Sequence, residues 1–258
     1  MRILVIPDIH EDLGFLNYIL TYEGTESFDH IVLLGDYFDA PPGVNPCDQR
    51  LRQVAERVLE IKQKVGDRMH LLCGNHDLPY YALRPACGNR EGRPNRRIGD
   101  WLVDTTQARA EIINEVWDDA FWRDLKGAVL LDDWLFSHAG VHPRWWSEQG
   151  KTSAERMACF DAYWSQVLNR LFVGREDPIC AIGPARGGAD AAIPGPLWQD
   201  WEEEFEDALE VPQIVGHTRD PEPAKKGRSY CLDMAQTAYA IVEAGTVRLN
   251  QVPDSGLE

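Results

Sequence analysis

Six short polar clusters run along the chain, and their residue types suit metal binding. They are Asp8-Ile9-His10, Gly35-Asp36-Tyr37-Phe38-Asp39, Gly74-Asn75-His76-Asp77, Ser137-His138-Ala139-Gly140, Arg186-Gly187-Gly188 and Gly216-His217-Thr218. At least four of them follow an apolar run, so they should meet at the strand ends where α/β sheets place their sites. Carboxylate, imidazole and amide oxygen ligands suit divalent ions such as Mn, Fe and Zn, and the absence of cysteine from the clusters argues against a thiolate zinc finger. The pattern predicts a metal centre.

The elements that would position these clusters can be read from the apolar pattern. Residues 2–6, 31–34 and 69–73 are short apolar runs bounded by polar residues, as in buried strands. Between them, apolar residues recur at three-to-four spacing over 13–20 and 51–61, as in amphipathic helices. This β-α-β-α-β series predicts a parallel sheet with right-handed crossovers.

The second half of the chain predicts further elements. An amphipathic stretch covers 101–122, and a helix is expected from about 153 to 171. Strands at 128–131 and 134–137 should form a hairpin with its turn at Asp132-Asp133. Strands at 213–215, 229–232, 238–243 and 246–250 are expected to form an antiparallel meander that closes the second side of the core.

Two segments break the rhythm of strands and helices. Residues 83–99 hold two prolines, three glycines and five arginines, a composition typical of an exposed loop. Residues 183–212 begin with Gly and Pro and then become strongly acidic. Within them, four apolar residues at helical spacing predict an amphipathic helix with a solvated acidic face: Trp198, Trp201, Phe205 and Leu209.

Composition narrows the class of protein and its partners. The 258 residues, 44% hydrophobic and 26% charged, fit one α/β domain with insertions. The net charge of -16 disfavours duplex nucleic acid as a partner. No stretch approaches 18 apolar residues and no cleavable leader is visible, so we expect no membrane association and a cytoplasmic location. The six cysteines form no C-x-x-C pair, so we expect reduced thiols. His30, His70 and His142 lie outside the clusters and receive no role.

The ordered clusters resemble the calcineurin-like metallophosphoesterase superfamily. The matching residues are Asp8-x-His10, Gly35-Asp36-x-x-Asp39, Gly74-Asn75-His76-Asp77, His138-Ala139-Gly140 and Gly216-His217-Thr218. The sequences of these motifs are similar to those of the branch that contains phosphoprotein phosphatases and symmetrical diadenosine tetraphosphatases. The resemblance implies an α/β fold with a central β-sandwich of two mixed sheets flanked by helices. It also implies a single domain over 1–258, with an Arg-rich loop at 83–99 and an insertion or cap around 183–212.

The resemblance also implies a role for each matching residue. Two divalent ions would be bound, most often Mn, with Fe or Zn as alternatives. Asp8 and His10 would hold the first ion, Asp36 would bridge both, and Asn75, His138 and His217 would complete the second. A hydroxide between the ions would attack phosphorus. His76 would protonate the leaving oxygen and Asp39 would orient it, with Asp77 the less favoured orienter.

The chain departs from the family pattern at two positions. In phosphoprotein phosphatases an arginine follows the second aspartate of the Gly-Asp-x-x-Asp motif and binds the phosphate; here that position is Ala40. Arg186 between glycines is the first replacement candidate, because glycine lets an anion approach closely, and the Arg-rich loop is the second. The second departure is Arg219, which stands where phosphodiesterases of the superfamily carry the second histidine of Gly-His-x-His. This favours a phosphomonoesterase or nucleoside polyphosphatase, and Arg219 is a further substrate-binding candidate.

These features predict a di-metal phosphoesterase. Its substrate would be a phosphorylated small molecule, a nucleotide or a phosphoprotein. The alternatives are a phosphodiesterase or nuclease of the same superfamily and, more remotely, a metal-binding scaffold that has lost catalysis. The scaffold would be expected to have lost His76 or a ligand, whereas all of them are present.

Overall fold

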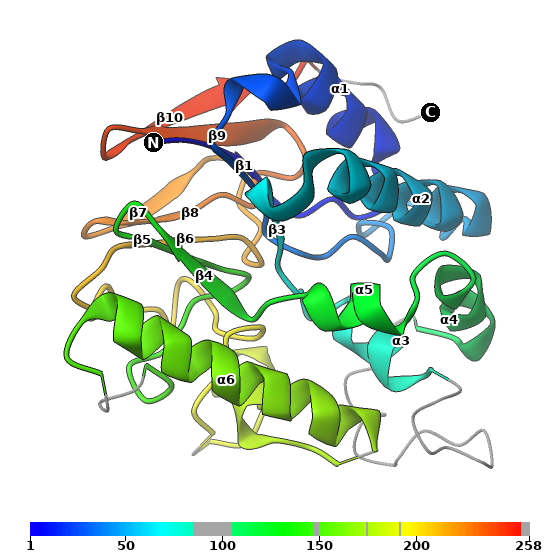
Figure 1. The fold of residues 1–258 in the computed structure, drawn as a ribbon. Helices are drawn as coiled ribbons and strands as arrows, with labels where there is room; N and C mark the ends of the chain where they lie inside the picture. Colours follow the sequence, from blue (N-terminus) through cyan, green and yellow to red (C-terminus); the bar gives the residue numbers. More distant parts are fainter. Residues whose placement is uncertain (85–104, 147–149, 174, 191, 254–258) are drawn as a thin grey trace.

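The computed structural model describes residues 1–84, 105–146, 150–173, 175–190 and 192–253. Two five-stranded mixed sheets lie face to face, with helices on their outer sides (Figure 1). This confirms the expected α/β sandwich of two mixed sheets flanked by helices. Among the described residues, no helix combines the length and the apolar character needed to cross a membrane.

The first sheet is built around the N-terminal strand. Its order is β10-β9-β1-β2-β3, with bounds β1 Arg2–Ile6, β2 His30–Leu33, β3 Met69–Leu71, β9 Ala238–Glu243 and β10 Thr246–Gln251. Strands β1, β2 and β3 are parallel, as predicted, while β9 pairs antiparallel with β1 and β10. The carboxyl ends of the three parallel strands therefore lie at one edge.

The second sheet has the order β4-β5-β6-β8-β7. Its strands are β4 Ala128–Leu131, β5 Trp134–Ser137, β6 Gln213–Val215, β7 Ala224–Lys226 and β8 Ser229–Cys231. The predicted hairpin is present as β4 and β5, and both turn residues, Asp132 and Asp133, have positive φ angles of 49° and 64°. Positive φ at both central residues is what a twisted two-residue hairpin turn requires. Strands β5, β6 and β8 run parallel, so this sheet too presents carboxyl ends together.

The expected C-terminal meander is wrong except for its last hairpin, in which β9 and β10 pair antiparallel as expected. Strands β6 and β8 belong to the second sheet and pair in parallel, whereas β9 and β10 join the first sheet. The physical reason lies in burial: β9 is buried at five successive positions, so it needs covering on both faces and a neighbour on each side. Strand β10 alternates between partly buried and exposed residues and forms the edge of the sheet. Periodicity identifies strands but does not assign their partners.

The hydrophobic core has two layers because side chains alternate along each strand. Ile3 and Val5 of β1 point between the sheets, where they pack with Phe136 and Ile214 of the second sheet. Leu4 and Ile6 point the other way, into the layer under the helices. The helices are α1 Leu13–Glu23, α2 Asp48–Val65, α3 Leu78–Ala82, α4 Gln107–Asn114, α5 Asp119–Asp124 and α6 Ser153–Phe172. Helix α6 packs against β4, and α4 packs against α2 and α3 (Figure 1).

Helix boundaries follow local capping chemistry. Asp12 accepts a hydrogen bond from the Phe15 N–H at the start of α1, and Thr152 and Glu155 form a capping box on α6. The described part of the predicted stretch 101–122 is divided into α4 and the start of α5, because Thr106 and Asp118 each cap a new helix. Amphipathic spacing alone did not reveal this break.

The predicted helix around 198–209 is also wrong, although its burial pattern is correct. Trp198, Trp201, Phe205 and Leu209 are all buried, but the segment is a series of turns. Asp200 Oδ1 accepts hydrogen bonds from the N–H groups of residues 202 and 203, and Glu204 accepts from those of residues 185 and 200. These acidic side chains bind backbone instead of forming a solvated helix face, because carboxylates compete for N–H groups that a helix would otherwise use.

Candidate metal centre

The predicted metal ligands meet at the carboxyl ends of the parallel strands of both sheets. Asp8 and Asp36 follow β1 and β2, Asn75 follows β3, and His138 and His217 follow β5 and β6. Strand pairing thus brings together residues separated by more than two hundred positions: the His217 N–H donates to Asp8 Oδ2 at 3.0 Å. Asp8, Asp36, Asn75 and His138 are nearly inaccessible to solvent.

Two groups of donor atoms share the Asp36 carboxylate. Asp8, His10 and Asp36 form one group and Asp36, His138 and His217 form the other, and within each group one ligand atom per residue lies within 4.8 Å of the others. Asn75 joins the second group, since its Oδ1 lies 2.9 Å from His138 Nε2 and 2.8 Å from His217 Nδ1. The two groups of potential ligand atoms therefore meet at one carboxylate, that of Asp36.

The protons on the histidines decide whether these contacts are hydrogen bonds. His138 Nδ1 lies 3.0 Å from the Leu34 carbonyl and His10 Nδ1 lies 2.8 Å from the Asp39 carbonyl, so each Nδ1 donates a proton to a carbonyl. The two Nε2 atoms face Asp36 Oδ2, at 3.4 Å and 3.7 Å. Where Nε2 carries no proton, its lone pair faces those of the carboxylate, and the two repel unless a cation lies between them. The donor set therefore fits divalent ions with mixed nitrogen and oxygen ligands.

Electrostatics support the same interpretation. Burial raises the pKa of Asp8 well above its usual range, and the neighbouring carboxylates of Asp233 and Asp36 add to this effect. Burial lowers the pKa of His138 and that of His217, so both rings are held neutral, as metal ligands must be.

The backbone around these ligands is strained, and glycines make room for the carboxylates. His10, Asp36 and His217 have φ angles of 48°, 48° and 70°, a region that non-glycine residues rarely occupy. A Cβ atom on Gly74 would lie 2.1 Å from Asp36 Oδ1, and one on Gly216 would lie 2.0 Å from Asp8 Oδ1. Both motif glycines are therefore needed for the close approach of a ligand.

His76 lies beside the ligands and is paired as predicted. The ring Nδ1 of His76 is 3.0 Å from Asp39 Oδ2, and the backbone N–H of His76 donates to Asp36 Oδ1 at 2.9 Å. Burial would lower the pKa of His76, but the carboxylates of Asp36 and Asp39 outweigh it and raise the pKa to about 9. Asp39 also accepts a hydrogen bond from the Tyr80 hydroxyl. The ring is thus held as a cation with a proton to give.

Asp77 has a different function from the orienting role considered for it. Its carboxylate accepts hydrogen bonds from the backbone N–H groups of Asp36, Tyr37 and Gly74 at 2.7–2.9 Å. It therefore joins the loop after β2 to the loop after β3. This leaves Asp39 as the carboxylate in contact with the His76 ring.

The proposed phosphate-binding arginines occupy different environments. Arg186 is part of a short 3₁₀ turn, Pro184–Arg186, and its Nη2 donates to Thr218 Oγ1 at 2.9 Å and pairs with Asp200 Oδ2 at 2.9 Å. Its charge also contributes to the lowered pKa of His217, so it lies near the second donor group. Arg219 is exposed.

Of the Arg-rich loop at 83–99, only residues 83 and 84 belong to the described part of the chain. Arg84 is buried and pairs with Asp119, so it is no part of an exposed loop. Arg90, Arg93, Arg96 and Arg97 lie outside the described residues, as does Cys87. The other five cysteines are free thiols, as expected.

Several residues near the site carried no role in the sequence. Asp233 follows β8, and its carboxylate lies close enough to Asp8 to raise the pKa of Asp8; the rule that polar residues follow buried strands could have found it. Gln236 donates to the Asp8 carbonyl at 3.0 Å. Tyr80 and Arg109 come from helices, and nothing in their sequence context indicates their proximity to Asp39.

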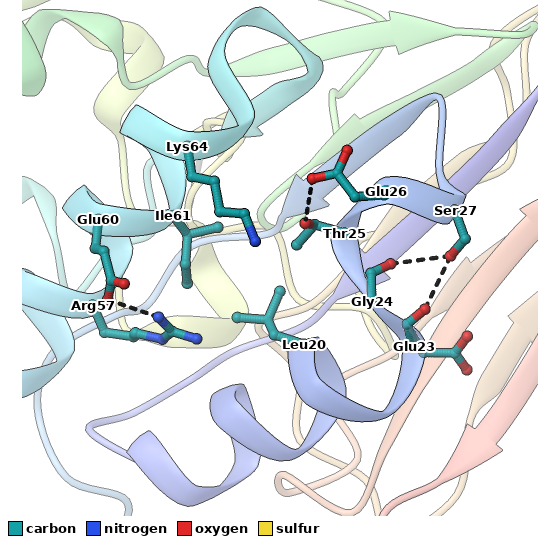
Figure 2. A pocket seen from close by; sticks show the side chains of 10 residues that line it. All are labelled: Leu20, Glu23, Gly24, Thr25, Glu26, Ser27, Arg57, Glu60, Ile61 and Lys64. Carbon is teal, nitrogen blue, oxygen red and sulfur yellow. Dashed lines mark hydrogen bonds and ion pairs between the residues drawn. The ribbon is translucent and has the colours of Figure 1, made fainter.

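A pocket of about 360 Å³ lies elsewhere, between the end of α1 and helix α2 (Figure 2). Its polar groups largely bind one another: Arg57 pairs with Glu60 at 2.7 Å, and the Ser27 hydroxyl donates to the carbonyls of Glu23 and Gly24. It contains no convergent set of unpaired donors comparable with the one around Asp36.

Comparison with known families agrees with this geometry. The profile of the family described as calcineurin-like phosphoesterase matches residues 1–220, which include every predicted metal ligand. The chain belongs to the calcineurin-like phosphoesterase family. It is accordingly a metal-dependent phosphoesterase, and the family implies divalent metal ions at a site such as the one described.

Solved structures share the fold at low sequence identity. A cold-active protein-tyrosine phosphatase of a psychrophilic Shewanella species superposes with a TM-score of 0.52 at 18% identity, over 97% of this chain and 80% of that one. A point mutant of a cold-active protein tyrosine phosphatase gives a TM-score of 0.54 at 17% identity, over 97% of this chain and 77% of that one. No curated protein matches the chain.

Proposed function

We propose that this phosphoesterase uses two divalent metal ions to hydrolyse phosphomonoesters or nucleoside polyphosphates. The observation that carries the proposal is the convergence of potential ligand atoms from five side chains on the two sides of the Asp36 carboxylate, an arrangement that two cations would stabilise. Asp8, His10 and Asp36 would hold one ion; Asp36, Asn75, His138 and His217 would hold the other. Mn is our first choice, with Fe or Zn as alternatives, since these ligands accept all three.

The bound ions would supply Lewis-acid polarisation of the phosphate and of an attacking water. The chain itself supplies the proton for the leaving group. His76 Nδ1 faces Asp39 Oδ2 at 3.0 Å, which leaves Nε2 as the atom that would donate to the leaving oxygen. Asp39 stabilises the imidazolium before the proton is given up and keeps the ring oriented.

Arg186 is proposed to bind the phosphate oxygens, because Ala40 occupies the position at which phosphoprotein phosphatases carry an arginine for this purpose. It is 32% exposed and held between Thr218 and Asp200, so its guanidinium can reach an incoming anion by leaving a single carboxylate. Arg219 is a second candidate for substrate contact. A cytoplasmic location and a single domain over 1–258, with an insertion or cap around 183–212, remain part of the proposal.

A substrate panel tests this function. The metal-free protein is loaded with Mn and assayed on para-nitrophenyl phosphate, bis(para-nitrophenyl) phosphate, a phosphotyrosine peptide, a phosphoserine peptide, diadenosine tetraphosphate and a cyclic nucleotide. We expect turnover of monoesters or the polyphosphate to exceed that of both diesters. A preference for the diesters would refute the proposal in favour of a phosphodiesterase. An Asp36→Asn variant is the control for contaminating phosphatase.

A further inference from the structure

A buried group of charges lies behind the His76–Asp39 pair. Glu11 is 1% exposed and Arg109 is 6% exposed, and the Arg109 Nη2 donates to Glu11 Oε1. On its other side, Arg109 Nη1 lies 3.6 Å from Asp39 Oδ1. One guanidinium therefore faces two buried carboxylates, and one of these is the carboxylate that holds His76.

Arg109 comes from a helix that is not part of the metal-binding loops. It lies on α4, which packs against α2 and α3, and α3 carries Tyr80. The Tyr80 hydroxyl donates to the same Asp39 Oδ1 that Arg109 approaches. Asp39 Oδ2 is left for His76, and the Asp39 carbonyl is left for His10. Asp39 therefore contacts the helical residues Tyr80 and Arg109 through Oδ1, and it contacts His76 and His10 through Oδ2 and its carbonyl.

The charges of Asp39 and Glu11 explain why a cation is needed at the position of Arg109. Asp39 is 2% exposed, Glu11 is 1% exposed and both lie against Arg109, so in the absence of Arg109 two buried carboxylates would remain with little solvent to screen their charges. Arg50 is a second cation near Glu11, at 3.9 Å, but its side chain is one-third exposed. Among the residues that the structure describes, the Nε and Nη1 atoms of Arg109 have no hydrogen-bond partner, and Nε lies 3.8 Å from the exposed Asp48 carboxylate, so the interaction of Arg109 with Asp39 is one of charge across 3.6 Å. Arg109 is too deeply buried to bind substrate.

We propose that Arg109 is a positioning residue that holds Asp39, and through it His76, in the geometry for proton donation to the leaving group. The inference rests on the proposed role of His76. It assigns a function to helix α4, which carries Arg109. The Arg109 guanidinium lies beside Asp39, the last residue of the Gly-Asp-x-x-Asp motif, which is followed here by Ala40 and not by an arginine.

The test measures how turnover depends on the leaving group. The Mn-loaded Arg109→Met variant should lose roughly 10-fold in kcat on phenyl phosphate, a part of the 10²–10⁴-fold worth of a positioned acid. On para-nitrophenyl phosphate, whose leaving group needs little protonation, it should lose less than about 3-fold. KM and metal content should stay unchanged, and Arg109→Lys should recover part of the loss. Combined with His76→Asn, Arg109→Met should add no further loss, because both act on one proton transfer.

Two matched variants separate this role from a general effect on folding. Arg52→Met removes the exposed ion pair with Glu115 between α2 and the end of α4, and it should leave the leaving-group dependence unchanged. If Arg109→Met fails to fold because Glu11 is left unpaired, Glu11→Gln combined with Arg109→Met removes both buried charges and should show the same selective loss.

The outcomes distinguish the two hypotheses. If His76→Asn is selective for phenyl phosphate but the Arg109 variants behave like Arg52→Met, the positioning role is refuted and the general acid stands. If His76→Asn shows equal loss on both substrates, the general-acid role itself is wrong, and the role of Arg109 fails with it. Equal loss on both substrates in Arg109→Met alone would also overturn the inference.

Discussion

The Gly216→Ala substitution should remove one metal ion selectively. The added Cβ would lie 2.0 Å from Asp8 Oδ1, and the next nearest atoms, at 3.1 Å and 3.5 Å, also belong to the Asp8 carboxylate. The φ angle of Gly216 is outside the left-handed region, so the backbone accepts alanine. The substitution therefore acts on one carboxylate.

The size of the effect follows from the distances. An ordinary contact begins at 3.4 Å, so the Asp8 oxygen must withdraw by roughly 1.4 Å from its position at 2.0 Å. A misplacement of about 1 Å in a reacting constellation costs on the order of 10²-fold in rate. Because Asp8 belongs to the first donor group and not to the second, we expect metal content to fall from about two ions per chain to about one, and kcat to fall about 10²-fold.

Elemental analysis of the Mn-loaded protein and kinetics on para-nitrophenyl phosphate are the assays. Gly14→Ala is the matched control: Gly14 lies in the first turn of α1, its Cβ would meet Asp12 Oδ1 at 3.3 Å, and the substitution should not change metal content. Two ions per chain and near-normal turnover in Gly216→Ala would refute the placement of Asp8 in the first group.

Three further predictions concern other parts of the molecule. Asp36→Asn should abolish activity and lower occupancy of both ions, because its carboxylate belongs to both groups; two retained ions with normal turnover would contradict the bridging role. Arg186→Ala should raise KM and lower kcat on monoesters without changing metal content, and unchanged kinetics would exclude it as the phosphate-binding arginine. Burial, His30 and Lys62 lower the pKa of His70 from 6.5 to about 4, so the unfolded chain takes up a proton first as the pH falls; the free energy of unfolding should fall between pH 6.5 and 4 and level off below. The wild type should lose about 1 kcal/mol more than His70→Gln between pH 7.5 and 5 in urea unfolding, a figure reduced for the partial exposure of His70, and equal losses would contradict the assignment.

The residues of the candidate metal centre could be selected from the sequence because the rule that finds each of them uses only neighbouring residues. A short apolar run forms a buried strand, a polar residue follows its carboxyl end, and parallel strands place such ends together. Asp8, Asp36, Asn75, His138 and His217 all obey this rule, and the structure brings them together. The helices over 13–23, 48–65 and 153–172 also matched their apolar spacing.

Only the tertiary structure decided which segments distant in the sequence contact one another. Burial on both faces made β9 an inner strand of the first sheet, which no periodicity could reveal. Carboxylates of Asp200 and Glu204 bound backbone N–H groups and turned an apparent helix into a series of turns. The approach of Arg109 to Asp39 depends on how α4 packs against α2 and α3. Contacts of this kind are decided by packing, because the sequence records side-chain chemistry but not which distant side chain will face it.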